Sequence, residues 1–229
     1  MKKNFILYLI FLGIISVSHA QSDWEILFDG TDLSQWKGYL KEDISSEWTV
    51  DNGILTFTPK PGREHGGSNI ITKKTYHNFE LSLEWNISSG GNSGIFWAIQ
   101  EDSKYAEPYQ TGPEIQILDN DKHPDGKILT HRAGSLYDMI QALPESAKPA
   151  GEWNLCVVKL NYDKNEASVH LNGVKVVEFQ PKGESWEQMI KASKFADWAG
   201  FAKSDTGHIG LQDHSDIVHF KNIKIRNLD

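Results

Sequence analysis

Residues 79–87 read FELSLEWNI, and this stretch is the clearest indication of the fold class. Apolar and polar side chains alternate along its length with a period of two. Successive side chains of a strand point to opposite faces, so this period is typical of a β-strand with one buried face. The buried set is Phe79, Leu81, Leu83 and Trp85, and the opposite set is Glu80, Ser82, Glu84 and Asn86. A strand of an antiparallel sheet with a core on one side is predicted here.

Similar stretches occur elsewhere along the chain, separated by Gly, Asn, Asp and Pro. EWTVDNGILTFTP (47–59) and SVHLNGVKVVEF (168–179) each place an Asn-Gly pair between two alternating runs, which is typical of a tight β-hairpin. Only SWEQMIKASKFADW (185–198) has helical spacing and composition. Irregular stretches at residues 60–69, 101–112 and 120–150 are predicted loops of a length that is often functional. We predict an all-β fold, an antiparallel β-sandwich or jelly roll with one short helix.

The first twenty residues, MKKNFILYLIFLGIISVSHA, have the pattern of a secretory signal peptide. Two lysines precede an apolar stretch, and Ser18-His19-Ala20 is a small-x-small cleavage site. We therefore expect residues 1–20 to be removed and residues 21–229 to form a single β-sandwich domain that is exported, periplasmic or extracellular. No cysteine lies near the cleavage site and no later apolar run is long enough to cross a membrane, so we expect no membrane anchor.

The charge balance is acidic. The formal net charge is −8, and loss of Lys2 and Lys3 with the signal peptide takes it to −10. A chain without a basic run does not attract nucleic acid or anionic lipid electrostatically, so neither is an expected partner. Cys156 is the only cysteine, which excludes a disulfide within the chain, and its apolar strand setting predicts a buried structural thiol.

Several segments together resemble one known family, the 3-keto-disaccharide hydrolase domain family, also described as 3-keto-glucoside-1,2-lyase/3-keto-2-hydroxy-glucal hydratase. The segments are LFDGTDLSQWKG, WTVDNGILT, FELSLEW, GNSGIFW, GPEIQILDN, AGSLYD, KPAGEWN, HLNGVKV and GHIGLQDHSDIVHFKNIKIRNL. The resemblance runs from about Trp24 to Leu228. It implies a concanavalin A-like, laminarinase-like β-sandwich with a concave carbohydrate-binding face, and an activity on 3-keto-glycosides.

The stretch GPEIQILDN (112–120) carries the candidate chemistry. Glu114 and Gln116 share one face of the predicted strand, whereas Asp119 falls on the other unless a bulge intervenes. A retaining glycosidase needs two carboxyl groups roughly 5–5.5 Å apart. Gln116 cannot supply a negative charge and Asp119 is one methylene shorter than a glutamate, so an ordinary double displacement fits this pattern poorly.

A sugar oxidised at carbon 3 offers another route, because its ketone acidifies the hydrogen at carbon 2. One base removes that proton, the glycosidic oxygen leaves by β-elimination, and water adds to the product. Glu114 is the favoured base and Glu84 the alternative, since each faces away from the apolar set of its strand. The sequence has no glycine-rich dinucleotide turn, so a separate sugar 3-oxidoreductase is expected to supply the ketone.

Other candidates surround this pair. Gln116 and Asn92 are expected to hold sugar hydroxyls, and Trp97, Tyr105 and Tyr109 to stack on the sugar or to pack in the core. His131 and Tyr137 lie on a long loop that could close over the groove, with His131 as an acid or base. Asp119 either takes part in catalysis or caps a turn. Gln212, Asp213 and His214 could bind hydroxyls or hold a divalent metal ion, the one candidate cofactor.

Two rival functions stay open at this point. One is an ordinary glycoside hydrolase of the laminarinase type, and the other is a lectin-like module that binds glycans without chemistry. A β-sandwich hosts both enzymes and lectins, so the fold does not choose between them. The carboxylates on the predicted inner face favour an enzyme.

Overall fold

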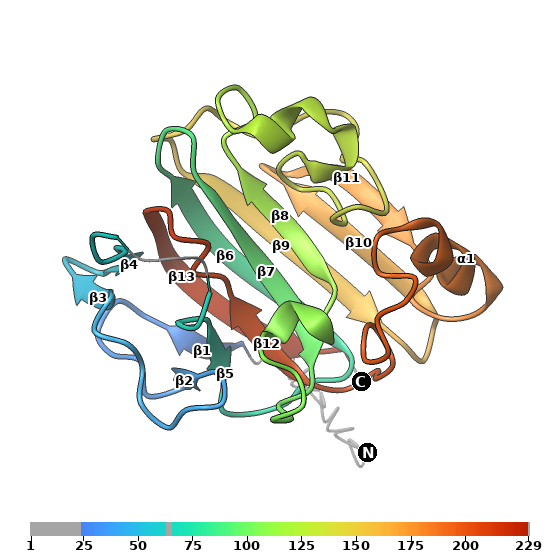
Figure 1. Ribbon diagram of the computed structural model, residues 1–229, viewed down its shortest axis with the longest axis horizontal. Coiled ribbons are helices and arrows are strands. Elements are labelled where there is room, and N and C mark those ends of the chain that lie inside the picture. Colours follow the sequence, from blue (N-terminus) through green and yellow to red (C-terminus); the bar gives the residue numbers. More distant parts are fainter. Residues whose placement is uncertain (1–23, 63–65, 229) are drawn as a thin grey trace, which may run out of the picture.

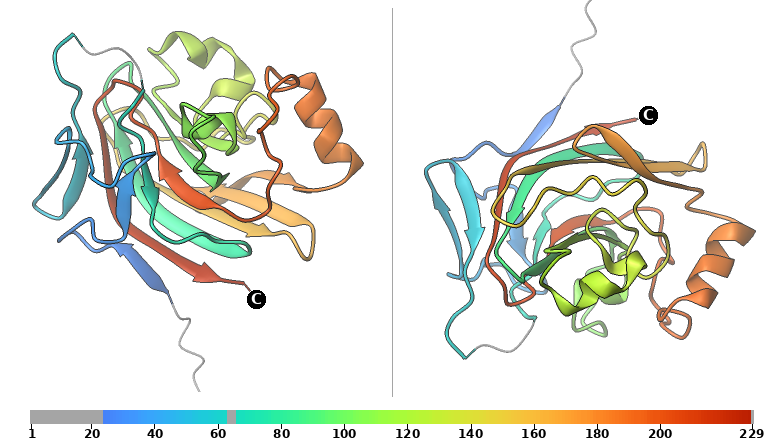
Figure 2. Two further views of the ribbon diagram at one scale, coloured as in Figure 1. Left: turned by 60° about the horizontal axis from the view of Figure 1, so that its bottom comes forward. Right: turned by 90° about the horizontal axis from the view of Figure 1, so that it is seen from above.

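The computed structural model describes residues 24–62 and 66–228, which form two antiparallel β-sheets stacked face to face (Figures 1 and 2). The larger sheet, sheet A, has the strand order β11-β10-β9-β6-β13-β4-β3, and β1 pairs with β13. Its strands are β1 (Glu25–Phe28), β3 (Trp48–Asp51), β4 (Ile54–Phe57), β6 (Phe79–Ile87), β9 (Asn154–Asn161), β10 (Glu166–Leu171), β11 (Val174–Phe179) and β13 (Val218–Asn227).

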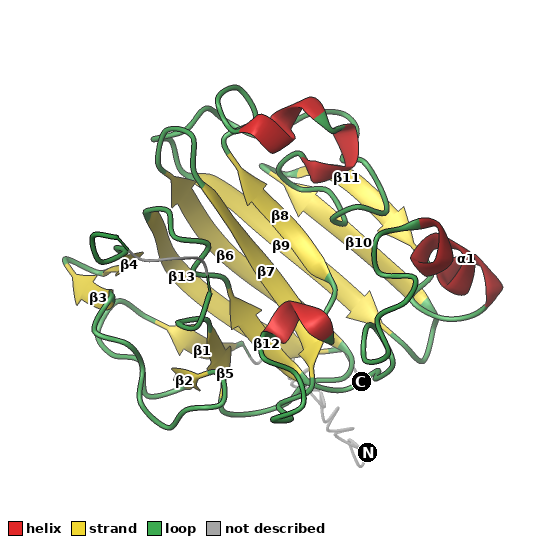
Figure 3. Ribbon diagram, viewed as in Figure 1, coloured by secondary structure: helices red, strands yellow, loops and turns green. Residues whose placement is uncertain are grey.

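The smaller sheet, sheet B, has the order β2-β5-β12-β7-β8. Its strands are β2 (Trp36–Gly38), β5 (Ile70–Thr72), β7 (Asn92–Ile99), β8 (Glu114–Leu118) and β12 (His208–Leu211). Among the described residues there is one α-helix, α1 (Glu184–Ala192), and three short 3-10 turns, η1 (Pro108–Gln110), η2 (Pro124–Lys127) and η3 (Leu129–His131), which lie outside the two sheets (Figure 3). The predicted all-β sandwich with one short helix is confirmed.

The core lies between the sheets. Phe79, Leu81, Leu83 and Trp85 of β6 are all buried, as their alternation predicts, and they pack in one cluster with Ile95 of β7 and with Ile115 and Ile117 of β8. The two Asn-Gly pairs form tight turns between β3 and β4 and between β10 and β11. Asn52, Gly53, Asn172 and Gly173 all have φ between 48° and 84°, the left-handed conformation that a type I′ hairpin requires.

The far edge of β8 does not stay unpaired. The amide of Gln116 donates to the carbonyl of Ser135 at 3.0 Å, and the amide of Gly134 donates to the carbonyl of Gln116 at 2.8 Å. The amide of Tyr137 likewise donates to the carbonyl of Glu114 at 3.0 Å. Part of the predicted 120–150 loop is thus an added rung of sheet B, which brings Tyr137 beside Glu114.

The helix is shorter than its pattern predicts. Helical spacing extends to Trp198, yet α1 ends at Ala192, and Ser193 bonds its side chain back to the Ile190 carbonyl at 2.8 Å. The next amide, that of Lys194, donates to the Asp138 carboxylate at 2.7 Å. A side chain from a distant loop therefore takes the hydrogen bond that would have continued the helix, and residues 193–201 turn back over sheet B. No helix in the described ranges is long and apolar enough to span a bilayer.

Candidate active site

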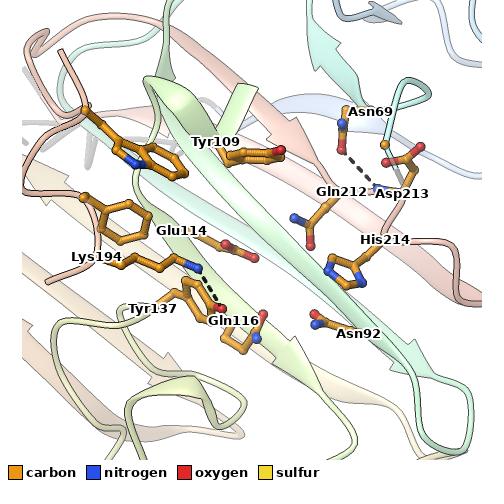
Figure 4. Close-up of a pocket in the computed structure, with 13 residues that line it drawn as sticks. Asn69, Asn92, Tyr109, Glu114, Gln116, Tyr137, Lys194, Gln212, Asp213 and His214 are labelled. Atoms are coloured by element: carbon orange, nitrogen blue, oxygen red, sulfur yellow. Dashed lines mark hydrogen bonds between the residues drawn. The ribbon is translucent and has the colours of Figure 1, made fainter. Parts of the chain in front are cut away.

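A pocket of about 340 Å³ lies on the outer face of sheet B, the face turned away from sheet A (Figure 4). Its lining comes from sheet strands, from η1 and from the segment after α1. The lining residues are Gly66, Asn69, Asn92, Tyr109, Glu114, Gln116, Tyr137, Lys194, Phe195, Trp198, Gln212, Asp213 and His214. A pocket of this size suits a small organic ligand.

The floor of the pocket comes from three neighbouring strands in register. Glu114 and Gln116 of β8 lie on the outer face, and Gly94 of β7 sits directly opposite Gln116. The amide of Gln212, just beyond β12, donates to the carbonyl of Gly94 at 3.0 Å. Asn92, two residues before Gly94, shares the same face because strand side chains alternate. Sheet geometry alone thus gathers one acid and three amides on one surface.

Three oxygens on this floor have no hydrogen-bond partner among the described residues. They are Asn92 Oδ1, Gln116 Oε1 and Gln212 Oε1, and all three are buried. A buried polar atom without a partner costs free energy, so such groups in native structures usually meet water or a ligand. Several acceptors facing one small pocket suit a ligand that carries several hydroxyl donors.

Glu114 is the acid of the floor and is only 8% exposed. Burial raises the pKa of its carboxyl to about 8, and the nearby Lys194 opposes this rise. No described residue donates a hydrogen bond to the carboxylate of Glu114. Gly94 makes its position possible, because a Cβ at Gly94 would come within 2.0 Å of Glu114 Oε1. A carboxyl group kept dry in this way is a stronger base than a solvated one.

Aromatic rings form one wall. The rings of Tyr109 and Trp198 lie 5.9 Å apart, and those of Phe195 and Trp198 meet edge to face at 5.1 Å. Tyr109 also packs against the small outer cluster that contains Phe96. Flat apolar faces beside unpartnered polar acceptors are a suitable surface for a pyranose ring, which has apolar faces and a hydroxylated edge.

Lys194 and Tyr137 stand across from this floor. Lys194 Nζ donates to the Tyr137 hydroxyl at 3.0 Å and lies 4.1 Å from the centre of the Tyr137 ring. Burial lowers the pKa of Lys194, and the carboxylates of Glu114, Asp138 and Asp125 oppose that shift. Burial, followed by the charge of Glu114, raises the pKa of Tyr137 well above its ordinary value, so its hydroxyl stays protonated.

The opposite end of the pocket holds a more rigid polar group. The amide of Asp213 donates to Asn69 Oδ1 at 3.1 Å, and Asn69 Nδ2 donates to the Glu107 carboxylate at 2.6 Å. Asp213 Oδ2 in turn accepts from the Ser68 amide at 2.8 Å. The pKa of Glu107 is raised, first by burial and then by the charge of Asp213. Among the described residues, no group of three or more His, Cys, Asp or Glu side chains is arranged to hold a metal ion.

The structure brings together eight of the residues that the sequence proposed for the site. They are Asn92, Tyr109, Glu114, Gln116, Tyr137, Gln212, Asp213 and His214, and all line the one pocket. They come from stretches more than 100 residues apart, which meet because β7, β8 and β12 are neighbours in sheet B.

The structure does not place Glu84 in this pocket. It lies on β6 of sheet A, with its carboxylate on the outer face of that sheet, where it accepts from Asn222 Nδ2 at 2.6 Å and lies 3.4 Å from Lys221 Nζ. Glu84 does face away from its apolar set, as predicted, but the outer faces of the two sheets lie on opposite sides of the molecule. It therefore cannot share a substrate with Glu114.

Asp119 and His131 also lie outside the lining. Asp119 accepts from the backbone amides of Gly90, Asp121 and Lys122 at 2.7, 3.1 and 3.3 Å, so it has the turn-capping role. These amides lower its pKa against the effect of burial, which works in the other direction. His131 lies behind Tyr137, with the two ring centres 4.3 Å apart, so it supports the pocket from outside.

Two of the three aromatic candidates pack within the protein, the second of the alternatives that the sequence left open. Trp97 is 2% exposed and donates from Nε1 to the Tyr162 hydroxyl at 3.2 Å in the core. It lies two residues after Ile95 on β7, so strand alternation turns both side chains inward. Asn92 and Gly94 turn outward. Tyr105 does not line the pocket either, because its ring packs against Gly200, where a Cβ would come within 2.3 Å of it.

The sequence reasoning missed five lining residues: Gly66, Asn69, Lys194, Phe195 and Trp198. The last three lie in the stretch 185–198, whose spacing predicts a helix. A signal was present in KFADW, since two aromatic residues beside a lysine at the end of a helical pattern are unusual for a solvated turn. Asn69 directly precedes β5, at the same end of sheet B as Gln212, and only the strand order reveals that.

An antiparallel β-sandwich with a buried acid, amide acceptors and aromatic rings in one small pocket suits a protein that acts on carbohydrates. Comparison with known proteins agrees, and it indicates a hydrolase that acts on sugars. The chain belongs to the family described as the 3-keto-alpha-glucoside-1,2-lyase-like domain, which matches residues 23–226.

Individual relatives support this membership. The chain is 38% identical to a 3-keto-disaccharide hydrolase of Bacteroides thetaiotaomicron, over 89% of this chain and 78% of that protein. It resembles the crystal structure of a candidate glycosyl hydrolase from Parabacteroides distasonis with a TM-score of 0.82 and 32% identity, over 90% and 94% of the two chains. A carbohydrate binding module from Bacillus subtilis, at 10% identity and a TM-score of 0.53, shares the fold alone over 84% of this chain and 96% of that one.

Proposed function

We propose that this protein is an exported enzyme that cleaves 3-keto-glycosides by elimination followed by hydration, with net hydrolysis of the glycosidic bond. One observation carries the proposal: Glu114 is a buried, unpartnered acid in a pocket whose other floor residues are amides. The name of the Bacteroides relative, a 3-keto-disaccharide hydrolase, supports the same substrate class.

The chemistry needs one strong base. A ketone at carbon 3 makes the hydrogen on carbon 2 acidic, and Glu114 removes it as a proton. The electron pair left on carbon 2 forms a double bond to carbon 1 as the bond from carbon 1 to the glycosidic oxygen breaks. The released alcohol gains one proton, which balances the one removed, and one water then adds across the double bond. No oxidant or reductant enters these steps.

The environment of Glu114 suits that role. Removal of a proton from carbon is difficult for an ordinary carboxylate, and a base whose pKa lies near the working pH is more effective. Burial raises the pKa of Glu114 to about 8, which makes its ionised form more basic than a solvated glutamate. The three unpartnered amide oxygens of Asn92, Gln116 and Gln212 would accept from sugar hydroxyls, with the ring against Tyr109 and Trp198.

A retaining glycosidase is less well supported by the same geometry. It requires a second carboxyl group about 5–5.5 Å from the first. Asp213 is the other carboxylate of the lining, but its Oδ2 is held by the Ser68 amide at 2.8 Å. In Figure 4, Gln212 lies between Asp213 and Glu114. An elimination, which places the chemical burden on one base, makes no demand on Asp213.

The experiment is turnover of two matched substrates by the purified protein. One is a 4-nitrophenyl glucoside and the other is the same compound oxidised at carbon 3, each tested in both anomers and with and without a chelator. Release of nitrophenol from the oxidised compound alone is the expected result. Release from the plain glucoside would contradict the proposal and favour an ordinary glycosidase. No release from any of them would favour a glycan-binding module instead.

The proposal also states where the substrate comes from and where the enzyme acts. The substrate ketone would come from a separate sugar 3-oxidoreductase. Export rests on residues 1–20, which lie outside the described residues. Sequencing of the amino terminus of the protein recovered from the periplasm or medium should find Gln21 first. Recovery of the full-length chain inside the cell would contradict export.

A further inference from the structure

Lys194 lines the open side of the pocket, where the residue as a whole is exposed, and it is held there by two hydrogen bonds. Its backbone amide donates to Asp138 Oδ2 at 2.7 Å, and its Nζ donates to the Tyr137 hydroxyl at 3.0 Å. Figure 4 shows the ammonium end of Lys194 directed into the pocket on the side of Glu114 and Tyr137. An ammonium group has three N–H donors, so the bond to Tyr137 leaves others for a ligand.

Asp138 connects this lysine to the loop behind the pocket. Its second oxygen lies 2.8 Å from His131 Nε2, and His131 Nδ1 lies 3.3 Å from Asp125 Oδ2. The His131 ring also supports the Tyr137 ring from behind at 4.3 Å. One aspartate thus fixes both the backbone of Lys194 and the histidine beneath Tyr137.

The backbone of Asp138 is itself strained. Its φ is +60°, a left-handed value that residues other than glycine adopt at a cost. Its amide donates to the Thr130 carbonyl at 3.1 Å, which helps to hold this conformation. Strained residues that their surroundings hold in place are concentrated at functional sites, because strain there serves to position groups.

The charges around Lys194 match a negative charge that develops in the pocket. Three carboxylates, those of Glu114, Asp138 and Asp125, favour the charged form of the ammonium, and the Tyr137 hydroxyl accepts a hydrogen bond from it. When Glu114 takes a proton from the substrate it becomes neutral. The negative charge then lies on the substrate, opposite the same ammonium.

We propose that Lys194 is the catalytic group that binds the ketone oxygen at carbon 3, and that Asp138 is the positioning residue that holds Lys194 and Tyr137 for this task. The proposal rests on the function proposed above and assigns a part of the reaction that Glu114 cannot perform.

Glu114 takes the proton from carbon 2, and the electron pair of that C–H bond forms a double bond to carbon 3 while the ketone oxygen becomes an enolate. Lys194 donates a hydrogen bond to this oxygen, and the Tyr137 hydroxyl accepts from Lys194 and holds its ammonium in place. The enolate then re-forms the ketone, its electron pair moves to the bond between carbons 1 and 2, and the glycosidic oxygen leaves and gains a proton. No net charge is gained or lost.

Hydrogen exchange at carbon 2 distinguishes binding of the ketone oxygen from assistance to the leaving group. In deuterated buffer, the enolate step exchanges the hydrogen on carbon 2 of an intact 3-keto-glycoside, whereas nitrophenol release reports departure of the leaving group. Lys194→Met should lower exchange and release together, each by about 10²–10³-fold, the usual effect of removing one preorganised donor. Lys191→Met, at an exposed lysine in the last turn of α1, is the matched control and should change neither.

Exchange that survives in Lys194→Met while release falls would overturn the proposal, because Lys194 would then serve the leaving group. Unchanged exchange and release would overturn it as well. A wild-type protein that neither exchanges nor releases would contradict the proposed function itself, which the variant result alone does not.

Asp138→Asn tests the positioning role. It keeps the size of the side chain but weakens the bonds to the Lys194 amide and to His131. We expect kcat to fall about tenfold with little change in KM. In the double variant with Lys194→Met we expect no further loss, since both changes act through one group. Multiplied losses in the double variant, with folding confirmed by its melting temperature, would show a separate structural role for Asp138 and overturn that part.

Discussion

Glu84 and Glu114 have equivalent places in the patterns of their strands, yet their surroundings differ completely. Each points away from the apolar set of its strand. Glu84 stands on the outer face of sheet A, beside Asn222 and Lys221, with its side chain 27% exposed. Glu114 stands on the outer face of sheet B, where burial raises its pKa to about 8.

The difference comes from what covers each sheet. Residues 134–137 pair with the edge of β8, and residues 193–201 turn back from α1, so that two loops close over Glu114. On the outer face of sheet A, Glu84 contacts an amide and a cation, and among the described residues its side chain stays 27% exposed. A strand pattern identifies an outward carboxylate, and the loops that cover it decide whether it becomes a base. Variants of the two glutamates can test this contrast.

The largest expected effect is on activity. Glu114→Gln keeps the shape of the side chain but removes the base, and loss of a general base typically costs about 10²–10⁴-fold in rate. We expect kcat on the 3-keto substrate to fall within that range. Glu84→Gln, measured in the same steady-state assay, should stay within a factor of two of the wild type. Equal losses in the two variants would remove the distinction between the two faces.

The second effect is on stability and depends on pH. The pKa of Glu114 rises from 4.5 to about 8 on folding. Between these values the native protein keeps a proton that the unfolded chain has lost, so stability falls as pH rises through this window. Glu114→Gln removes that loss and should unfold with a free energy larger by about 5 kcal/mol above pH 8, and by little below pH 4.5. Urea unfolding at both pH values, with Glu84→Gln as the control, measures it. If the variant and the wild type differ in unfolding free energy by the same amount at both pH values, the burial argument is contradicted.

The pH dependence of the rate follows from the same pKa. The base must be ionised, so kcat/KM should rise about tenfold per pH unit up to about pH 8 and then level off. At higher pH it should fall as Lys194, whose pKa is lowered by burial, loses its proton. A rate that declines steadily from acid to neutral pH would mean that Glu114 acts as an acid.

A fourth prediction concerns the glycine beneath Glu114. A Cβ at Gly94 would lie 2.0 Å from Glu114 Oε1, so Gly94→Ala must displace the carboxylate. Displacement by about 1 Å in an active site can cost about 10²-fold in rate. We expect kcat to fall by roughly that amount while the fold persists, as circular dichroism can verify. Full activity in Gly94→Ala would mean that the position of Glu114 is unimportant.

The smallest effect is expected on binding. Gln116→Leu removes one of the unpartnered oxygens of the floor, and a hydrogen bond to a neutral partner contributes about 1 kcal/mol. KM on the 3-keto substrate should rise about fivefold to tenfold with kcat little changed. A loss in kcat as large as that of Glu114→Gln would assign Gln116 a part in the chemistry.

Much of this site follows from the sequence, because strand periodicity is a local property. The alternation around Glu114, Gln116 and Asn92 predicts that they face outward, and the Asn-Gly pairs predict both hairpins. The same rule places Trp97 in the core, and applied to β7 it would have excluded it as a stacking platform.

What the sequence could not reveal depends on contacts between distant segments. Lys194 continues a helical pattern, but its amide donates to the Asp138 carboxylate, 56 residues earlier, and the helix ends before it. Which of two outward glutamates is buried likewise depends on which loops fold over which sheet. Neither choice is encoded in a local period.

The most direct test of a base-driven elimination at Glu114 follows the hydrogen on carbon 2 of the sugar. The 3-keto-glycoside is cleaved in deuterated buffer, and the released sugar is examined at once by mass spectrometry and NMR, with the product incubated alone as a control for spontaneous exchange. Elimination and hydration predict one deuterium on carbon 2 of every product molecule. Cleavage that leaves the original hydrogen on carbon 2 would contradict a base-driven elimination at Glu114.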